Sequence, residues 1–442
     1  MYQKTMEVFI LHRMAKWILA CALALCLLVS AAVAESYYVE LPAKGITSSM
    51  NITVNVPAEN PVIDGINPLT GEPWSGKYCP ILVNIDAHPD ALPHWGIASA
   101  DIMYEMPVQE DGSTRSVGVF MGNIPSYAGP IRSGRVPMAS LREMYDGAWV
   151  FYGWQNWAVG KDLVVDVDQW VNHLHPGSNV GSTWHFPFVE GIGTSRKLFH
   201  REKDGMHVAP HDVQVDMKAV HDMFTRESVK HPFLFTETGL DRGTDVSEIT
   251  INYKETKPAY VTNYKYNAVT GTYDRYRNGE AYYDALTGQT TTYANVIVLR
   301  TSVTWYKGAS QRPVIQFVGQ GTAEIFQNGK YIRGTWVRTN NAGVADEFAS
   351  QPYRMVFLDE NGQELQLKVG KTFIQVVNND ASVIVTSGEQ IQGGVARATP
   401  VPTATPKPTR TPKPTRTPRA SQATPAPVMQ MEGEGEDATF GG

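Results

Sequence analysis

Hydrophobic and polar residues alternate in short runs through the first half of the chain. Runs at Cys79–Asp86, Asp101–Gln109 and Arg115–Asn123 have the length and the flanking turn residues of β-strands. Another buried strand is predicted at Gly147–Trp154. The segment "EDGST" between the second and third runs is typical of a hairpin loop, so these two strands are expected to pair.

Two segments near these strands have a helical pattern. Val136–Tyr145 carries Pro137 in its first turn, where the missing N–H of proline costs little. Apolar residues recur at helical spacing over Val213–Arg226, and Asp212 before them can cap a helix. Because strands are interleaved with helices, we expect an α/β domain over residues 63–230.

The helical period disappears beyond residue 230. Short runs rich in β-branched and aromatic residues follow, and Asn-Gly pairs at 278–279, 328–329 and 361–362 are typical of tight turns with positive φ angles. This pattern predicts a β-rich domain over residues 231–390. The expected fold is therefore an α/β N-terminal domain followed by a β-rich C-terminal domain.

The two ends of the chain have a different character. Residues 1–34 run from basic residues through an apolar stretch to "AVA", which is typical of a signal peptide cleaved after Ala34. A retained membrane anchor and lipidation at Cys21 are the alternatives. Residues 35–62 are expected to be a linker, and the Pro/Thr-rich residues 391–442 a disordered tail.

Charge and motifs exclude several classes of function. The net charge is −6, and cleavage of the basic leader would make the chain more acidic, which argues against nucleic acid as a partner. No membrane span remains if the leader is removed. There is no GxxxxGK[ST], no HExxH and no paired CxxC, so we expect no metal and no cofactor.

Strand alternation identifies two carboxylates with potential for acid/base chemistry. Asp86 and Glu105 each lie on the less apolar face of a predicted strand and would converge if the strands were neighbours. His211, in "VAPHDV", is placed to assist as a proton shuttle. The alternative is that each carboxylate caps a turn or pairs with an arginine.

The segment "GPIRSGR" joins a predicted strand to a predicted helix. Arg132 and Arg135 offer planar donor groups that suit carboxylate or phosphate, and Ser133 adds a hydroxyl. Anion recognition is one interpretation. The other is that both arginines pair with carboxylates of the chain itself, at Asp86, Asp101 or Glu105.

Several motifs in fixed order resemble those of the YerB-like family of bacterial surface lipoproteins. They are "NPLTGEP", "ILVNIDAHPDALPHWGIASADIMYE", "GSTRSVGVF", "GPIRSGR" and "APHD", followed by "IFQNGKYIRGTWVR" and "GKTFIQVV". The resemblance covers roughly residues 67–377. It implies a two-part domain of unknown function and a location at the bacterial cell surface, and it implies no reaction.

We therefore expect a secreted or envelope-associated protein that binds an anionic or glycan ligand of the cell envelope. A hydrolase of an envelope polymer and a structural partner in a surface complex are the alternatives. The candidate catalytic residues are Glu105, Asp86 and His211. The candidate ligand-binding residues are Arg115, Arg132, Ser133, Arg135, Asp101 and Trp154.

Overall fold

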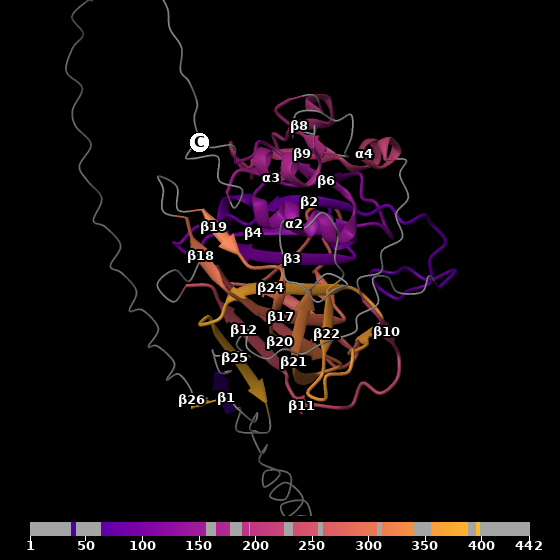
Figure 1. The fold of residues 1–442 in the computed structure, drawn as a ribbon, viewed down its shortest axis with the longest axis vertical. Helices are drawn as coiled ribbons and strands as arrows, with labels where there is room; N and C mark the ends of the chain where they lie inside the picture. Colours follow the sequence, from indigo (N-terminus) through magenta and orange to yellow (C-terminus); the bar gives the residue numbers. More distant parts are fainter. Residues whose placement is uncertain are drawn as a thin grey trace, which may run out of the picture. The chain divides into compact units, whose positions relative to one another are not determined.

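The computed structural model describes ten stretches of the chain (Figure 1). They are residues 37–40, 63–155, 165–176, 188–193, 195–224, 233–254, 260–306, 312–338, 355–387 and 395–397. All of them lie in one compact unit, Met1–Thr399. The predicted signal peptide and nearly all of the predicted tail lie outside the described residues.

The largest element is an eleven-stranded sheet with strands from both halves of the chain. Along the main path the order is β11-β21-β20-β17-β24-β3-β4-β2-β6-β7, and β22 pairs with β21. The strands are β2 (Ile81–Asp86), β3 (Ile102–Pro107), β4 (Thr114–Phe120), β6 (Ala148–Phe151), β7 (Phe188–Glu190), β11 (Thr244–Asp245), β17 (Asn295–Thr301), β20 (Gly319–Gln327), β21 (Lys330–Arg338), β22 (Val356–Leu358) and β24 (Thr372–Asn378).

The two halves meet where β24 pairs in parallel with β3, from Thr372 opposite Ile102 to Gln375 opposite Glu105. Figure 1 shows these strands side by side although their colours are far apart along the sequence. Residues 63–230 and 231–390 therefore contribute to one continuous sheet.

An eight-stranded sheet is built mainly from the second half of the chain. Its strands are β1 (Tyr37–Glu40), β12 (Glu248–Asn252), β13 (Val261–Asn267), β14 (Thr272–Arg277), β15 (Glu280–Ala281), β16 (Thr292–Tyr293), β25 (Ser382–Ser387) and β26 (Val395–Arg397). The first of these lies in the predicted linker. Smaller sheets are formed by β5 (Tyr127–Ala128), β8 (Phe199–Arg201) and β9 (Val213–Asp216), by β18 (Val303–Trp305) and β19 (Pro313–Ile315), and by β10 (Phe235–Thr236) and β23 (Leu367–Lys368).

The prediction of an α/β N-terminal domain is wrong, because the protein is β-rich throughout. The described residues contain three α-helices, α2 (Val136–Tyr145), α3 (Val167–Leu174) and α4 (Met217–Met223), and three short 3₁₀ turns at Pro89–Ala91, Ile97–Ser99 and Arg196–Leu198. Strands β2, β4 and β3 follow one another as antiparallel neighbours, without the helical crossovers that an α/β sheet requires. None of these helices is long and apolar enough to cross a membrane.

The local predictions have mixed outcomes. The helix Val136–Tyr145 is confirmed with its bounds. The helix predicted over Val213–Arg226 is wrong in its first turn, where β9 pairs with β5 and β8. Val213 and Val215 alternate into the core as β-branched strand residues do, and Asp216 rather than Asp212 caps the helix through Ala219 N.

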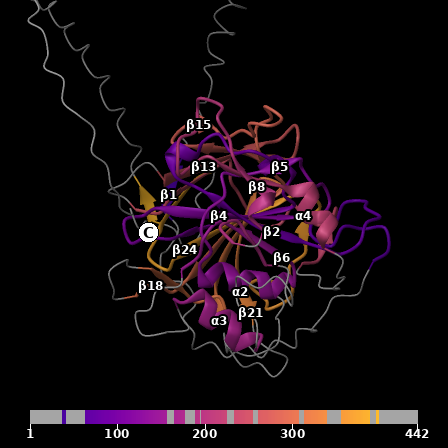
Figure 2. The ribbon, with the colours of Figure 1, turned by 90° about the horizontal axis from the view of Figure 1, so that it is seen from above.

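The core lies on both faces of the eleven-stranded sheet. One face carries Leu82, Tyr104 and Val117 and is covered by α2 and α3, which lie together in Figure 2. The other face carries Met103 and Phe120 and packs against the eight-stranded sheet and α4. The sheet is therefore buried on both sides at its centre, and β2 and β3 are buried at every position.

A buried ion network joins the two large sheets. Glu105 on β3 is fully buried, and its Oε2 and Oε1 lie 2.7 Å from Arg275 Nη2 and 3.2 Å from Arg277 Nη1, both on β14. Thr114 Oγ1 donates to Glu105 Oε1 at 2.6 Å, and Gln375 Nε2 donates to Oε2 at 3.2 Å. Burial alone would raise the pKa of Glu105, but the charges of Arg277 and Arg275 lower it below its usual value.

We predict that Glu105→Gln lowers the free energy of unfolding by about 3–5 kcal/mol, because two buried guanidinium groups lose their counterion. Because the pKa of Glu105 is lower in the folded protein than in the unfolded chain, its ionised form stabilises the fold at pH values above its pKa in the unfolded chain. This contribution is lost as the pH falls through the pKa of Glu105 in the folded protein. Urea denaturation of both proteins between about pH 7 and pH 3 should therefore give a difference that shrinks toward acid. The exposed change Glu72→Gln is the control, and equal effects of the two substitutions would contradict the prediction.

Candidate functional site

The loop Gly129–Arg135 is held between β2 and β9 by backbone hydrogen bonds. Asp86 N donates to Pro130 O at 2.8 Å, and Ile131 N donates to Val213 O at 2.8 Å. A Cβ atom at Gly129 would lie 2.6 Å from Val213 O, so the close approach requires glycine there. This packing brings the residues just before β9 next to the carboxyl end of β2.

Four arginines gather around this loop. Arg132 and Arg135 come from the loop, Arg115 comes from β4, and Arg312 lies just before β19. Arg115 and Arg135 are buried, whereas the Arg132 side chain is 30% exposed. The result is a concentration of positive charge at one end of the buried sheet.

The charges of the four arginines act on one another. Burial lowers the pKa of Arg115 to about 10. The charge of Asp86 opposes this shift, and the charges of Arg132 and Arg312 reinforce it. Burial and the neighbouring charges of Arg115, Arg312 and Arg132 hold the pKa of Arg135 well below its usual value. Because like charges oppose one another at short range, the cluster would be stabilised by an anion.

The guanidinium groups of this cluster are only partly satisfied within the described residues. Arg115 Nη1 donates to Ser133 O at 3.0 Å, and Arg135 Nη1 donates to Gly134 O at 2.9 Å. The Nε atoms of Arg115, Arg135 and Arg312 are buried and have no hydrogen-bond partner in the part of the chain that the structure describes. Buried donors normally have partners, so these three donors are exceptions, as Arg275 Nε and Nη1 are in the Glu105 network.

Asp86 is the carboxylate that faces this cluster. Arg132 Nε lies 3.1 Å from Asp86 Oδ2, and Asp86 pairs with Arg115 across strands β2 and β4. Burial would raise the pKa of Asp86, but the hydrogen bond from His211 and the charges of Arg115 and Arg132 hold it far below its usual value. Among the described residues, Asp86 therefore interacts with two of the four arginines, Arg115 and Arg132.

His211 also contacts this carboxylate. His211 Nδ1 lies 2.6 Å from Asp86 Oδ2. With the proton on Nδ1, the imidazole donates to Asp86 and keeps the lone pair of its Nε2. The ring of His211 stacks on His88 with 4.4 Å between centroids and 15° between planes. A carboxylate, a histidine and the arginines therefore share one end of the sheet.

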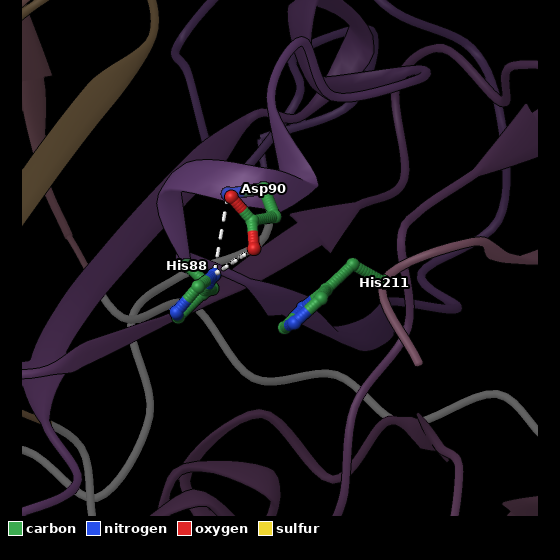
Figure 3. A group of neighbouring side chains, drawn as sticks. All are labelled: His88, Asp90 and His211. Atoms are coloured by element: carbon green, nitrogen blue, oxygen red, sulfur yellow. Dashed lines mark hydrogen bonds and ion pairs between the residues drawn. The ribbon is translucent and has the colours of Figure 1, made fainter. Parts of the chain in front are cut away.

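Figure 3 shows His88 and His211 with Asp90, the group of described residues whose ligand atoms could hold a metal ion. Their ligand atoms lie within 4.8 Å of one another. His88 Nδ1 already accepts a hydrogen bond from Asp90 N at 3.2 Å. Because a metal lies near the plane of each imidazole it binds, the nearly parallel rings would have to turn before both could bind one ion. The prediction of no metal was made from motifs alone, and the donor set fits an ion poorly in this geometry.

Glu105 and Asp101 do not join this group. Strand β4 separates β3 from β2, and Glu105 faces the eight-stranded sheet whereas Asp86 faces the opposite side. Asp101 accepts hydrogen bonds from Asn67 Nδ2 at 2.8 Å and Met121 N at 2.7 Å. The predicted Asp86–Glu105 pair is therefore not formed. The alternation within each strand could show neither that a third strand separates them nor that the two side chains lie on opposite faces of the sheet.

Ser133 and Trp154 have modest roles in the described structure. Ser133 contributes its carbonyl oxygen, which accepts from Arg115 Nη1 and, at 3.2 Å, from Asn84 Nδ2. Trp154 Nε1 donates to Asp168 Oδ2 at 2.9 Å, and its ring packs against the core. Neither contact tests ligand binding, so both assignments stay predictions.

Sequence reasoning missed Arg312 and His88. Arg312 lies far along the chain from "GPIRSGR" and reaches the cluster only because the β18–β19 hairpin packs near α2. His88 follows strand β2 by two residues, and its backbone N donates to Asp86 Oδ1 at 3.1 Å. The position of His88 just after a predicted strand was a usable signal, whereas nothing local marked Arg312.

The fold and the site define a β-rich protein of two packed sheets with an arginine-rich cluster at one end of the central sheet. Two family models match the chain. The N-terminal domain of "Protein of unknown function (DUF3048)" matches residues 69–230, and the C-terminal domain of the same family matches residues 249–374. The chain belongs to this two-part family, which confirms the resemblance found in its motifs.

Two comparisons with individual proteins agree with this assignment. A Bacillus subtilis (strain 168) protein named "Putative lipoprotein YerB" is 23% identical over 332 residues, which cover 73% of this chain and 89% of that protein. The crystal structure of the YerB protein from Bacillus subtilis has a TM-score of 0.58 at 22% identity and covers 72% of this chain and 99% of that one. This likeness supports a shared fold.

We predict that Asp86→Asn lowers the free energy of unfolding by about 3 kcal/mol, because it removes the counterion of a buried cationic cluster. Added sodium sulfate should recover more stability in this variant than in the wild type, since sulfate can replace the missing negative charge. Asp359→Asn is the control, because Asp359 is also buried and paired but contacts Arg242 instead. Equal recovery in both variants, as general salting-out would give, would contradict the prediction.

Proposed function

We propose that this protein is associated with the bacterial envelope and binds an anionic group of an envelope ligand at Arg115, Arg132, Arg135 and Arg312. The observation that carries the proposal is the excess of buried positive charge, with three buried Nε donors that lack partners among the described residues. Buried donors without acceptors destabilise a fold, so several of them beside the partly exposed Arg132 favour a role in binding.

The chemistry of the cluster favours phosphate or carboxylate oxygens. Guanidinium groups donate in planar pairs that match such oxygens, and several donors converging from different elements suit a group with several oxygens. Arg132 is the partly exposed member, so it marks the side from which a ligand would enter. The ion pair with Asp86 orients Arg132.

The proposed location rests on the relatives rather than on the site. The name "Putative lipoprotein" of the Bacillus subtilis relative is consistent with attachment at the cell surface. The apolar leader at residues 1–34 and the Pro/Thr-rich tail are consistent with an exported protein that acts in the envelope. Anionic polymers are a chemical class of ligand that such a location provides.

We expect inorganic phosphate to bind the wild-type protein and Arg132→Ala to weaken that binding about tenfold, which corresponds to about 1.4 kcal/mol for a lost charge-assisted contact. Isothermal titration calorimetry measures the affinity, and the thermal midpoint should rise with phosphate in the wild type. The matched control is Arg333→Ala, because Arg333 is also 30% exposed and lies near a buried carboxylate, Glu324.

Two results would reject the proposal. One is a wild-type protein that binds neither phosphate nor the soluble anionic polymers of a cell-wall extract. The other is an equal loss of affinity in Arg132→Ala and Arg333→Ala, because this would show an effect of net charge rather than of the cluster.

A second candidate function is hydrolysis of an envelope polymer, and the 2.6 Å contact between His211 Nδ1 and Asp86 Oδ2 favours it. In this arrangement Asp86 would orient the imidazole, and His211 Nε2 would take a proton from an attacking water. The arginines would hold the anionic group beside the bond that is cleaved. Glu105 has no part in this version, since it faces the other side of the sheet.

If the protein is a hydrolase, purified wild type should release new reducing or phosphomonoester ends from cell-wall fragments, and His211→Ala should lower the rate by about 10²-fold or more. The control is His221→Ala, because the His221 side chain is 48% exposed and pairs with Asp222 on α4. Absence of new ends from the wild type between about pH 5 and pH 8, the range in which a histidine base titrates, would leave binding as the function.

A further inference from the structure

A pocket of about 340 Å³ opens at the same end of the eleven-stranded sheet as the arginine cluster. Its walls come from the β3–β4 loop, the end of β12, β18 and the β24–β25 turn. A cavity of this size is large enough for one or two sugar rings. None of the residues predicted from the sequence as site residues lines it.

The lining combines aromatic rings with side chains that bind hydroxyl groups. Trp305 and Tyr253 contribute the rings. The Tyr253 hydroxyl contacts Glu105 O at 2.9 Å and Gln375 Oε1 at 2.5 Å, so its polar end is satisfied inside the protein. Sugar rings present apolar C–H faces that pack on such aromatic rings.

The polar part of the lining offers both acceptors and donors. Glu110, Asp380, Asn252 and Asn378 line the pocket together with Lys254. Asn378 Nδ2 donates to Asp380 Oδ1 at 2.6 Å, and Lys254 N donates to Asn252 Oδ1 at 3.1 Å, so several of these groups are held in place before a ligand arrives. Fixed carboxylates and amides are suited to hydroxyl groups.

The charge of the pocket differs from that of the arginine cluster. Two carboxylates, Glu110 and Asp380, face one ammonium group, that of Lys254, whose Nζ donates to Glu110 O at 2.7 Å. A second phosphate would be repelled here. An uncharged, hydroxyl-rich group would not be repelled, and it would satisfy both the acceptors and the rings.

We propose that this pocket binds an uncharged sugar unit. The pocket and the arginine cluster are joined by one short hairpin, in which Trp305 pairs with Pro313, the residue after Arg312. On the other side Pro107 lines the pocket, and its neighbour Met106 pairs with Arg115. A glycan that carries an anionic group would therefore span both sites, and this linked part of the inference rests on the proposed anion binding.

The test is calorimetric titration of the full chain with three neutral trisaccharides, those of glucose, galactose and N-acetylglucosamine. We expect at least one to bind at concentrations below about 10 mM. Trp305→Ala should abolish this binding. Glu110→Gln, a change at an exposed side chain that leaves the fold undisturbed, should weaken it about tenfold through the loss of a charged hydrogen bond.

The matched control is Trp74→Ala, because Trp74 is also half-buried and packs against the same core as Trp305 but does not line the pocket. Failure of all three trisaccharides to bind overturns the inference, and so does binding that survives both Trp305→Ala and Glu110→Gln. An effect of Trp74→Ala as large as that of Trp305→Ala, with Glu110→Gln unchanged, also overturns it.

Inorganic phosphate in a separate titration keeps the two proposals apart. Phosphate binding without trisaccharide binding overturns the sugar pocket and leaves the anion site standing. Trisaccharide binding by a protein that binds neither phosphate nor the soluble anionic polymers supports the pocket and rejects the arginine cluster as an anion site. Arg132→Ala should weaken phosphate binding and leave trisaccharide binding unchanged, since Arg132 does not line the pocket.

Discussion

The parallel pairing of β24 with β3 is the constraint on which the rest of the structure depends. It merges the strands of the two halves into one sheet, and Glu105 fastens that sheet to the other through Arg275 and Arg277. The buried charge of Glu105 has to be neutralised by these arginines, so the two sheets have to dock in the one register that brings them together. With this docking fixed, the carboxyl ends of several strands lie together at one end of the sheet, and both candidate sites lie there.

The two buried clusters of charge differ in their exposure to solvent. Glu105 has two arginines, a threonine and a glutamine around it, so the negative charge at the centre of its network is fully satisfied. In the cluster around Asp86, that carboxylate interacts with Arg132 and Arg115, and burial, reinforced by the neighbouring arginines, lowers the pKa values of Arg115 and Arg135. Two arginines also share the single carboxylate of Glu105, and Arg275 Nε and Nη1 are buried without a partner among the described residues. The Asp86 cluster is distinguished by the partial exposure of Arg132, which gives it an opening to solvent.

The sequence predicts what depends on neighbouring residues and misses what depends on distant ones. Helix Val136–Tyr145 and the strands around Asp86 and Glu105 follow from local patterns, and the structure confirms them. The valines at the start of Val213–Asp216 fit a helical period as well as a strand period, and only pairing with other strands decides between them. For the same reason the loop arginines were identified as a candidate site, whereas Arg312 was not.

Two regions of opposite charge lie at this end of the central sheet. On one side of the β18–β19 hairpin, arginines outnumber carboxylates, and on the other side Glu110 and Asp380 outnumber Lys254. A ligand of uniform charge would be repelled by one of the two surfaces. A polymer that alternates neutral sugars with anionic groups would be repelled by neither if its units fall in the matching order. If both proposals hold, this arrangement suits a repeating anionic glycan better than a simple anion.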